Sequence, residues 1–157
     1  MEGIVQPLKL VDGSQVRLIP GKHHELQIAI IDFFGPRFAS GSSILYLGDT
    51  FNKPVIYERE LLEQLGVPTS IHDKLPDILL YRKGQNWLYL IKTVTYCELI
   101  SHNRFRELEE SLEGATAKRV YVSAFSNRTE YRRYASHIAW GTTVWIAAIP
   151  EHLIHYV

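Results

Sequence analysis

The feature that most constrains the fold is a pair of apolar segments in the middle of the chain, separated by a short polar turn. Residues 77–81 and 87–95 are rich in leucine, isoleucine, valine and aromatic residues, which favours strands. Lys83-Gly84-Gln85 lies between them and supplies turn residues. The sequence therefore predicts two neighbouring antiparallel strands that belong to one sheet.

Helix and strand patterns alternate along the rest of the chain. Asp12-Gly13, between two short alternating segments, predicts an N-terminal hairpin. Gly35-Pro36 is expected to stop the helix that begins at His24. The predicted helices cover residues 24–34, 58–65, 101–112 and 127–139, and the further strands cover 44–47, 119–125, 142–148 and 153–156. We expect a three-layer α/β (or α+β) fold with a mixed central sheet flanked by helices. Which helix covers which face stays open.

Composition and charge are those of an ordinary globular domain. The 157 residues carry 17 Lys+Arg and 17 Asp+Glu, and 46% are hydrophobic, which excludes a disordered chain and argues against nucleic-acid binding by bulk positive charge. The one cysteine, Cys97, excludes an internal disulfide and is typical of a reducing compartment. We expect one cytoplasmic domain over residues 1–157, with 1–20 as a hairpin extension and 21–157 as the core.

Several familiar motifs are missing from the sequence. The ten glycines sit singly at turns, so no phosphate-binding loop is predicted. His23 and His24 are adjacent and would point in different directions on a helix, so they lack metal-ligand spacing. Cys97 is interpreted as an inert thiol.

Asp77, at the head of the first strand of the central hairpin, is the remaining candidate for chemistry. With the turn at residues 83–85, Asp77 comes to lie opposite or nearly opposite position 92, and such cross-strand neighbours are about 5 Å apart. A carboxylate beside apolar strand residues is costly to bury without a partner. Two interpretations stay open: a metal-ligating carboxylate, or a strand-end aspartate satisfied at a turn.

Several blocks of the sequence, in the same order and with matching spacing, carry a family resemblance. They are residues 45–53, 62–68, 72–77, 86–91, 121–125, 138–140 and 144–147. In these blocks the chain resembles the catalytic domain of the BsuBI/PstI-type type II restriction endonucleases, from about Gly21 to Tyr156. Such enzymes resemble members of the PD-(D/E)xK nuclease superfamily, whose α-β-β-β-α-β core agrees with the predicted elements.

The resemblance implies Mg²⁺-dependent hydrolysis of phosphodiesters in double-stranded DNA, by a homodimer, in a restriction–modification system. It makes Asp77 the first metal-binding carboxylate and Glu25 a candidate further acidic ligand. Asp49 and Lys53 match the family's Gly-Asp…Lys block and would contact the phosphate or a metal-bound water, and a turn aspartate is the alternative for Asp49. Asp77, Asp49, Lys53 and the residue at position 92 are the expected catalytic positions.

This chain departs from the family pattern where the family carries acids. The family's Ile-Glu-Ala-Val-Thr is Ile-Lys-Thr-Val-Thr here, so Lys92 replaces the second carboxylate. The family's Ser-His-Gly-Pro segment is replaced at residues 96–99. Gly141 and Thr143 replace two acids of the family's Trp-Glu-Thr-Glu-Val-Trp. The hydrophobic pattern survives these changes, which is typical of relaxed selection on catalysis.

Lys92 is expected to pair with Asp77 at the position of the metal. Opposite charges ~4 Å apart attract by about 4 kcal/mol at an effective dielectric near 20, and the same ammonium repels a divalent cation twice as strongly as a monovalent one. An alternative keeps the metal site: Glu98 could enter it, or Lys92 could serve as the motif's lysine with Glu25 and Asp49 as ligands.

Arginines on two predicted helices are candidate contacts to DNA phosphates. They are Arg104 and Arg106 on one helix and Arg128, Arg132 and Arg133 on the other, with Lys53 as a further candidate. The alternative is an ordinary solvated helix face, because glutamates are interleaved with these arginines.

Three functions stay open from the sequence. The first is an active type II endonuclease domain, and the second is a catalytically impaired module that binds DNA or a partner protein without cleaving. The third is a decayed fragment that has kept its fold. Family members usually carry an N-terminal helical domain for DNA recognition, and we expect it to be absent because the core helix begins so early in this chain.

Overall fold

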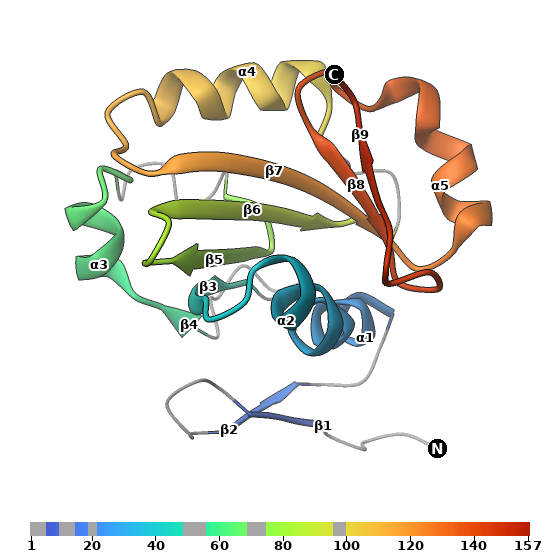
Figure 1. The fold of residues 1–157 in the computed structure, drawn as a ribbon, viewed down its shortest axis with the longest axis horizontal. Coiled ribbons are helices and arrows are strands. Elements are labelled where there is room, and N and C mark those ends of the chain that lie inside the picture. Colours follow the sequence, from blue (N-terminus) through green and yellow to red (C-terminus); the bar gives the residue numbers. More distant parts are fainter. Residues whose placement is uncertain (1–5, 10–14, 19–21, 49–55, 69–74, 96–99) are drawn as a thin grey trace.

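A computed structural model describes residues 6–9, 15–18, 22–48, 56–68, 75–95 and 100–157. Its centre is a seven-stranded sheet with the order β4-β3-β5-β6-β7-β8-β9 (Figure 1). The strands are β3 (Ser43–Leu47), β4 (Ile56–Tyr57), β5 (Ile78–Arg82), β6 (Trp87–Thr93), β7 (Lys118–Phe125), β8 (Thr143–Ile146) and β9 (Leu153–His155). The central hairpin predicted from the sequence is β5–β6, which confirms its position and its turn.

The sheet is mixed, as the sequence predicts. β5 and β6 are antiparallel, whereas β6–β7 and β7–β8 are parallel and β8–β9 is antiparallel again. Parallel neighbours need a crossover connection, and α4 (His102–Ser111) lies in the connection between β6 and β7. The carboxyl ends of β6, β7 and β8 therefore lie together on the side of the sheet where these strands end, which we call the Asp77 edge.

Helices cover both faces of the sheet, so the fold has three layers (Figure 1). On one face, helix α1 (Lys22–Ala29), the π-helix η1 (Ile30–Phe34) and α2 (Gly35–Phe38) contribute Leu26, Ile30 and Phe34 to a core shared with Ile78, Ile91 and Trp145. On the other face, α3 (Arg59–Gln64) and α4 pack through Leu62, Leu108 and Leu112.

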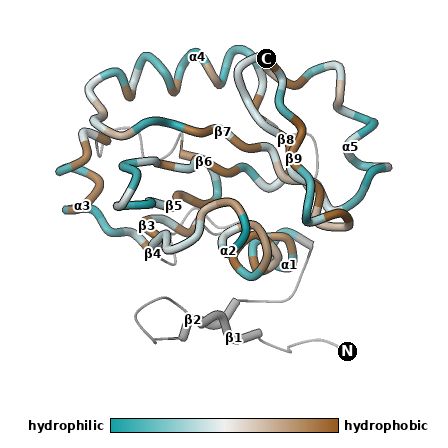
Figure 2. Tube along the Cα trace, in the orientation of Figure 1, coloured by the Kyte–Doolittle hydropathy of each residue, from teal (hydrophilic) through white to brown (hydrophobic). Residues whose placement is uncertain are grey.

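Helix α5 (Arg128–Tyr134) lies on the same face as α4, because its Tyr131 and Tyr134 pack on Phe125 and Val144. Figure 2 shows the hydrophobic residues concentrated in the strands and the hydrophilic residues concentrated on α4 and α5. The three-layer α/β fold with a mixed sheet is therefore confirmed, and the structure adds which helix covers which face.

The predicted end of the first helix at Gly35-Pro36 is wrong. The helix passes through a π-turn, in which the Gly35 N–H donates to the Ile30 carbonyl, and continues as α2 with Pro36 at its first positions. Proline is tolerated there because the first turn of a helix has no partner for that N–H. Two further differences concern α5 and β4. Helix α5 is shorter than the predicted 127–139 and is followed only by the short 3₁₀ helix η3 (Ala135–His137). The two-residue strand β4 was not predicted.

The N-terminal hairpin is confirmed by the backbone pairing. Strands β1 (Gln6–Lys9) and β2 (Gln15–Leu18) are antiparallel, with Leu8 opposite Val16. Asp12-Gly13 lies outside the described residues. In the part of the chain that the structure describes, no helix is long and apolar enough to cross a membrane.

Candidate functional site

The candidate site lies where the first strand of the central hairpin begins and the second ends. Ile78 pairs with Ile91 in the β5–β6 ladder, so Asp77, one residue before β5, lies opposite Lys92 near the end of β6. This is the register predicted from the turn. It places the two side chains on the same side of the hairpin at the Asp77 edge.

Asp77 and Lys92 form the predicted ion pair. Lys92 Nζ lies 3.6 Å from Asp77 Oδ2, with 22% of the lysine side chain and 14% of the aspartate side chain exposed. The structure therefore confirms the pairing inferred from the strand register, and it places an ammonium group against the carboxylate that the family pattern assigns to a metal.

Thr93 supplies two hydrogen-bond donors to the same carboxylate. Its backbone N–H and its hydroxyl each donate to Asp77 Oδ2 at 2.7 Å. Two hydrogen bonds to one carboxylate oxygen fix the orientation of the carboxylate. Thr93 is itself 3% exposed, so the backbone and a buried side chain hold Asp77 in place.

His23, on α1, completes this cluster from the neighbouring layer. Its Nδ1 is 3.0 Å from Thr93 Oγ1 and its Nε2 is 3.9 Å from Asp77 Oδ1. Because the Thr93 hydroxyl donates its one proton to Asp77, the Nδ1–H of His23 is the donor to Thr93 Oγ1. The sequence reasoning missed both Thr93 and His23. The position of Thr93 next to Lys92 in the sequence could have indicated that Thr93 belongs to the site. No residue near His23 in the sequence gives such an indication.

The described residues of this site do not fit a magnesium ion. Mg²⁺ takes six oxygen ligands in a near-octahedral arrangement, but Asp77 Oδ2 already accepts two hydrogen bonds and faces an ammonium group. Among the residues the structure describes, no group of three or more His, Cys, Asp or Glu could hold a metal. Glu25, the candidate further ligand, is an exposed residue of α1.

Three residues of the predicted site, Asp49, Lys53 and Glu98, lie outside the described residues. The end of β3 that leads to Asp49 is fixed beside the site. The Gly48 N–H donates to the Asp77 carbonyl at 2.7 Å, and the buried Gln27 side chain donates to the Gly48 carbonyl at 2.9 Å. The backbone at Gly48 is thus held against Asp77.

Positions 141 and 143, where the resemblance implies acids in other members of the family, have structural roles of their own. Gly141 adopts a φ of +87°, a left-handed conformation that favours glycine. The Thr143 side chain is buried, and its hydroxyl lies 3.2 Å from His155 Nδ1. Neither position can carry a negative charge in this chain.

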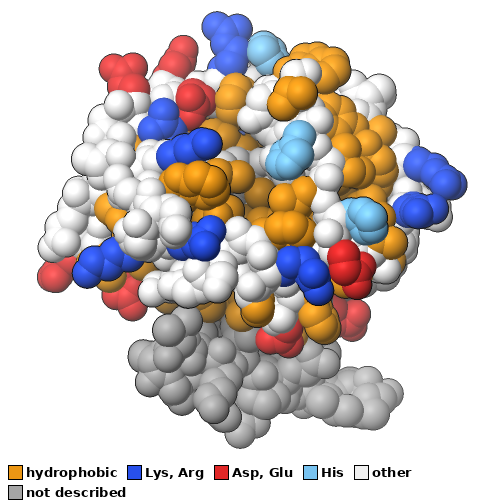
Figure 3. Space-filling view, in the orientation of Figure 1, with side chains coloured by type: hydrophobic (Ala, Val, Ile, Leu, Met, Phe, Trp, Pro, Cys, Tyr) orange, Lys and Arg blue, Asp and Glu red, His pale blue; other side chains and the backbone are white. Residues whose placement is uncertain are grey.

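The predicted DNA-contacting arginines are exposed and lie on helices that begin near the Asp77 edge. Arg104 is in the first turn of α4, where its backbone N–H is capped by Ser101 at 3.2 Å, and its side chain pairs with Glu107 at 3.5 Å. Arg128 opens α5, which follows the carboxyl end of β7, and Arg132 lies in its last turn. On the face shown in Figure 3, Lys and Arg side chains are scattered, with some gathered at the α5 end.

A second charged cluster lies at the opposite edge of the sheet, near the start of β7. The Arg119 Nε–H donates to Glu109 Oε2 at 2.7 Å, and the Tyr121 hydroxyl donates to the same oxygen at 2.5 Å. The hydrogen bond from Arg119 lowers the pKa of Glu109, and burial raises the pKa of Tyr121. The cluster lines an open hollow of about 560 Å³ between α4 and the sheet.

The fold defines the class of the protein. The chain superimposes with a TM-score of 0.90 on the solved structure of SdaI restriction endonuclease, with 34% identity over 98% of this chain and 48% of that one. The protein thus has a restriction-endonuclease fold, which confirms the predicted fold class.

Sequence comparison identifies the family within that class. The family model of the BsuBI/PstI restriction endonuclease domain matches residues 6–157, and the chain belongs to this family. It is 43% identical over 150 residues to the type II restriction enzyme BsuBI of Bacillus subtilis, covering 96% of this chain. It is 27% identical to the type II restriction enzyme AplI of Arthrospira platensis, covering 95% of this chain. The chain spans 48% of the length of each of these relatives.

Proposed function

We propose that this domain binds double-stranded DNA as the nuclease-fold domain of a type II restriction–modification system, and that its present sequence binds without hydrolysing phosphodiesters. Membership of the restriction-endonuclease family supports DNA as the ligand. The exposed arginines of α4 and α5 support contact with the phosphate backbone beside the Asp77 edge. The same proposal includes a homodimer, in which each copy contacts one strand of the DNA, and a cytoplasmic location.

The observation that supports the proposed loss of hydrolysis is the Asp77–Lys92 ion pair. At 3.6 Å the two charges attract by about 4–5 kcal/mol at an effective dielectric near 20, and a divalent cation entering this position would have to displace the ammonium group. Phosphodiester hydrolysis at neutral pH in such a fold depends on metal-activated water. With Lys92 at this position, the charge balance at Asp77 opposes metal binding.

An active Mg²⁺-dependent endonuclease is the second candidate function, and one observation favours it. The Gly48 N–H to Asp77 carbonyl hydrogen bond of 2.7 Å holds the end of β3 at the site, and Asp49 is the next residue. An active enzyme would take its further acidic ligands from Glu25, Asp49 and Glu98, with Lys92 or Lys53 as the assisting lysine.

A plasmid-nicking assay with MgCl₂ separates the two candidates. The native chain, Lys92→Glu and the control Lys83→Glu, which makes the same charge change at the far end of the hairpin, are compared at equal concentration. We expect Lys92→Glu to cleave at least ~100-fold faster than the native chain, which corresponds to about 3 kcal/mol of transition-state stabilisation. Lys83→Glu should stay as inactive as the native chain.

Cleavage by the native chain that is lost in Asp77→Ala would overturn the proposal in favour of the active enzyme. Calorimetric titration with MnCl₂ provides a readout that does not depend on activity. We expect the native chain to take up no stoichiometric tight ion. Tight binding that disappears in Asp77→Ala would contradict the proposed loss of the metal site.

A further inference from the structure

We infer that Lys92 binds a phosphate of the DNA backbone directly, so that DNA binding at the Asp77 edge needs no divalent cation. The inference rests on the proposed function, because it assumes that DNA is the ligand. It adds the group that holds the phosphate and the ionic conditions under which DNA is held.

The first support is the charge of the site. A glutamate at position 92, as the family resemblance implies for other members, gives two carboxylates and a local charge of minus two with Asp77. Lys92 makes the charge of this pair zero, because one ammonium balances one carboxylate. Two carboxylates repel a phosphate until a cation intervenes, whereas a neutral pair does not.

The second support is the way Asp77 is held. Its Oδ2 accepts two hydrogen bonds of 2.7 Å from Thr93, so Asp77 is oriented without help from Lys92. The Lys92 Nζ lies 3.6 Å from that oxygen, beyond the usual length of a hydrogen bond. This contact with Asp77 is therefore a pairing of charges, which does not bind any of the three N–H donors of the ammonium to Asp77.

The third support is the chemistry and placement of the ammonium. Lys carries three N–H donors and binds phosphates as a point charge, so one ammonium can face a carboxylate and a phosphate together. The Lys92 side chain is 22% exposed. Lys92 is the last residue but one of β6, and the arrowhead in Figure 1 marks the carboxyl end of that strand. Asp77 faces this ammonium, and Thr93 and His23 contact Asp77 rather than Lys92 in the contacts described above.

The test is fluorescence anisotropy of a labelled duplex of mixed sequence, titrated with protein in EDTA and in MgCl₂ at several salt concentrations. We expect the native chain to bind equally in both buffers, within about twofold. Lys92→Gln should weaken binding by about 3–10-fold and reduce the slope of log K against log[salt] by about one phosphate contact. Lys92→Arg should keep the native slope.

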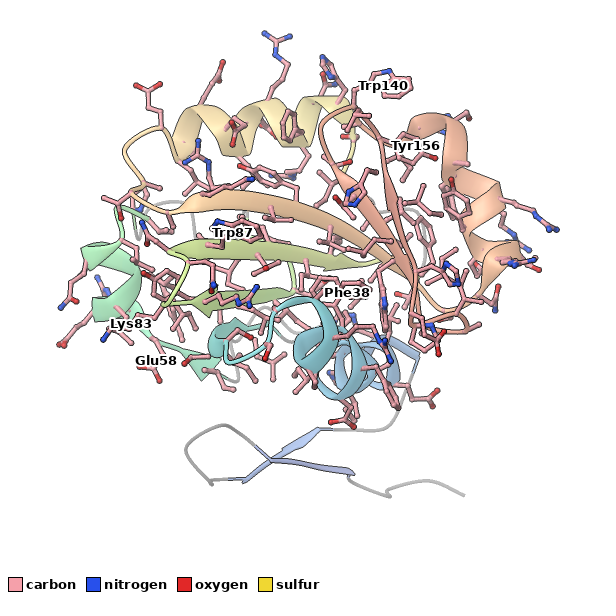
Figure 4. All side chains as sticks on the ribbon, in the orientation of Figure 1. Phe38, Glu58, Lys83, Trp87, Trp140 and Tyr156 are labelled. Atoms are coloured by element: carbon pink, nitrogen blue, oxygen red, sulfur yellow. The ribbon has the colours of Figure 1, made fainter. Side chains whose placement is uncertain are left out.

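Two matched variants separate this role from a structural one. Lys83→Gln removes a lysine from the turn at the far end of the same hairpin (Figure 4) and should leave the slope unchanged. Asp77→Asn removes the negative neighbour and should tighten binding in EDTA by about 3-fold or more. A metal-binding aspartate would give the opposite sign, because its loss would weaken binding in MgCl₂.

The inference is overturned if Lys92→Gln keeps the native salt slope, or if MgCl₂ raises native affinity more than about tenfold and Asp77→Asn removes that gain. In those cases DNA binding still stands and the proposed function survives. A native chain that binds no duplex in either buffer would overturn the proposed function, and the inference with it.

Discussion

The two edges of the sheet each carry a carboxylate, a cation and a hydroxyl donor, but the parts are joined differently. At one edge Asp77 meets Lys92 and Thr93, which lie on the neighbouring strand of the same hairpin. At the other, Glu109 of α4 meets Arg119 and Tyr121 of β7, so the pair joins a helix to the sheet.

This difference separates a structural ion pair from one that changes a site. The Glu109–Arg119 pair has a hydrogen bond of 2.7 Å and joins a helix, α4, to a strand, β7, which do not share a backbone ladder. The Asp77–Lys92 pair is longer, at 3.6 Å, and joins strands that the backbone ladder already pairs. We therefore expect changes at Arg119 to affect mainly stability and changes at Lys92 to affect mainly the charge offered to ligands.

Inverting the cation at each edge should give the largest effect. Arg119→Glu loses its bonds to Glu109 and brings two carboxylates together, so the free energy of unfolding should fall by about 3 kcal/mol. Lys92→Glu should lose about 1–2 kcal/mol and recover it in MgCl₂, because an ion that binds only the native state stabilises it. Thermal unfolding measures both, with about 2–4 °C for each kcal/mol at this size. Equal recovery of the two variants in MgCl₂ would refute the contrast between the edges.

Removing each cation without inverting it should give the next largest effect. Arg119→Met should lower the free energy of unfolding by about 1–2 kcal/mol, since a charged hydrogen bond between helix and sheet is lost. Lys92→Met should cost less than about 1 kcal/mol, as is usual for partly exposed pairs. Urea unfolding at neutral pH gives both values. The opposite ranking would show that the hairpin pair is the structural one.

Removing the hydroxyl donors tests the part that the two edges share. Thr93→Val and Tyr121→Phe each delete one O–H donor to a carboxylate and should each cost about 1 kcal/mol. Thr129→Val, at an exposed position of α5, is the control and should stay within about 0.5 kcal/mol of the native chain. Urea unfolding of the three variants measures these changes in the free energy of unfolding. A Thr93→Val cost no larger than that of the control would mean that the Thr93 N–H alone holds Asp77.

The smallest effect concerns acid pH. The hydrogen bond from Arg119 lowers the pKa of Glu109 from its ordinary value of 4.5. The charged Glu109 therefore stabilises the folded state above that pH, and this contribution is lost as the pH falls through the lower pKa of the folded state. Arg119→Met should therefore flatten the fall in stability below about pH 5, by less than ~1 kcal/mol because the pair is partly exposed. Urea unfolding from about pH 3 to 6 compares the variants, with Lys92→Met as control. Superimposable curves for Arg119→Met and the native chain would contradict the assignment.

The parts of the fold and site that local sequence determines were predictable. Alternating apolar residues around a polar turn define the β5–β6 hairpin, and the position of that turn is enough to place Asp77 opposite Lys92. The end of the first helix was not predictable in this way, because the π-turn that carries the chain through Gly35-Pro36 depends on packing of Ile30 and Phe34 in the core.

The rest of the site depends on contacts between distant residues. His23 meets Thr93 across 70 positions of sequence, and this contact requires α1 to pack on the β6 end of the sheet. Nothing in the neighbourhood of His23 in the sequence indicates that placement. The roles assigned to Glu25, Asp49, Lys53 and the arginines stay predictions.

The outermost strands of the sheet are very short: β4 has two residues and β9 has three. Long exposed strand borders serve as templates for pairing with other chains, whereas short ones offer few backbone groups. Within the described residues, then, the sheet has little capacity to grow by adding strands from a second molecule. Pairing with a second molecule through β4 or β9 would therefore form only a few backbone hydrogen bonds.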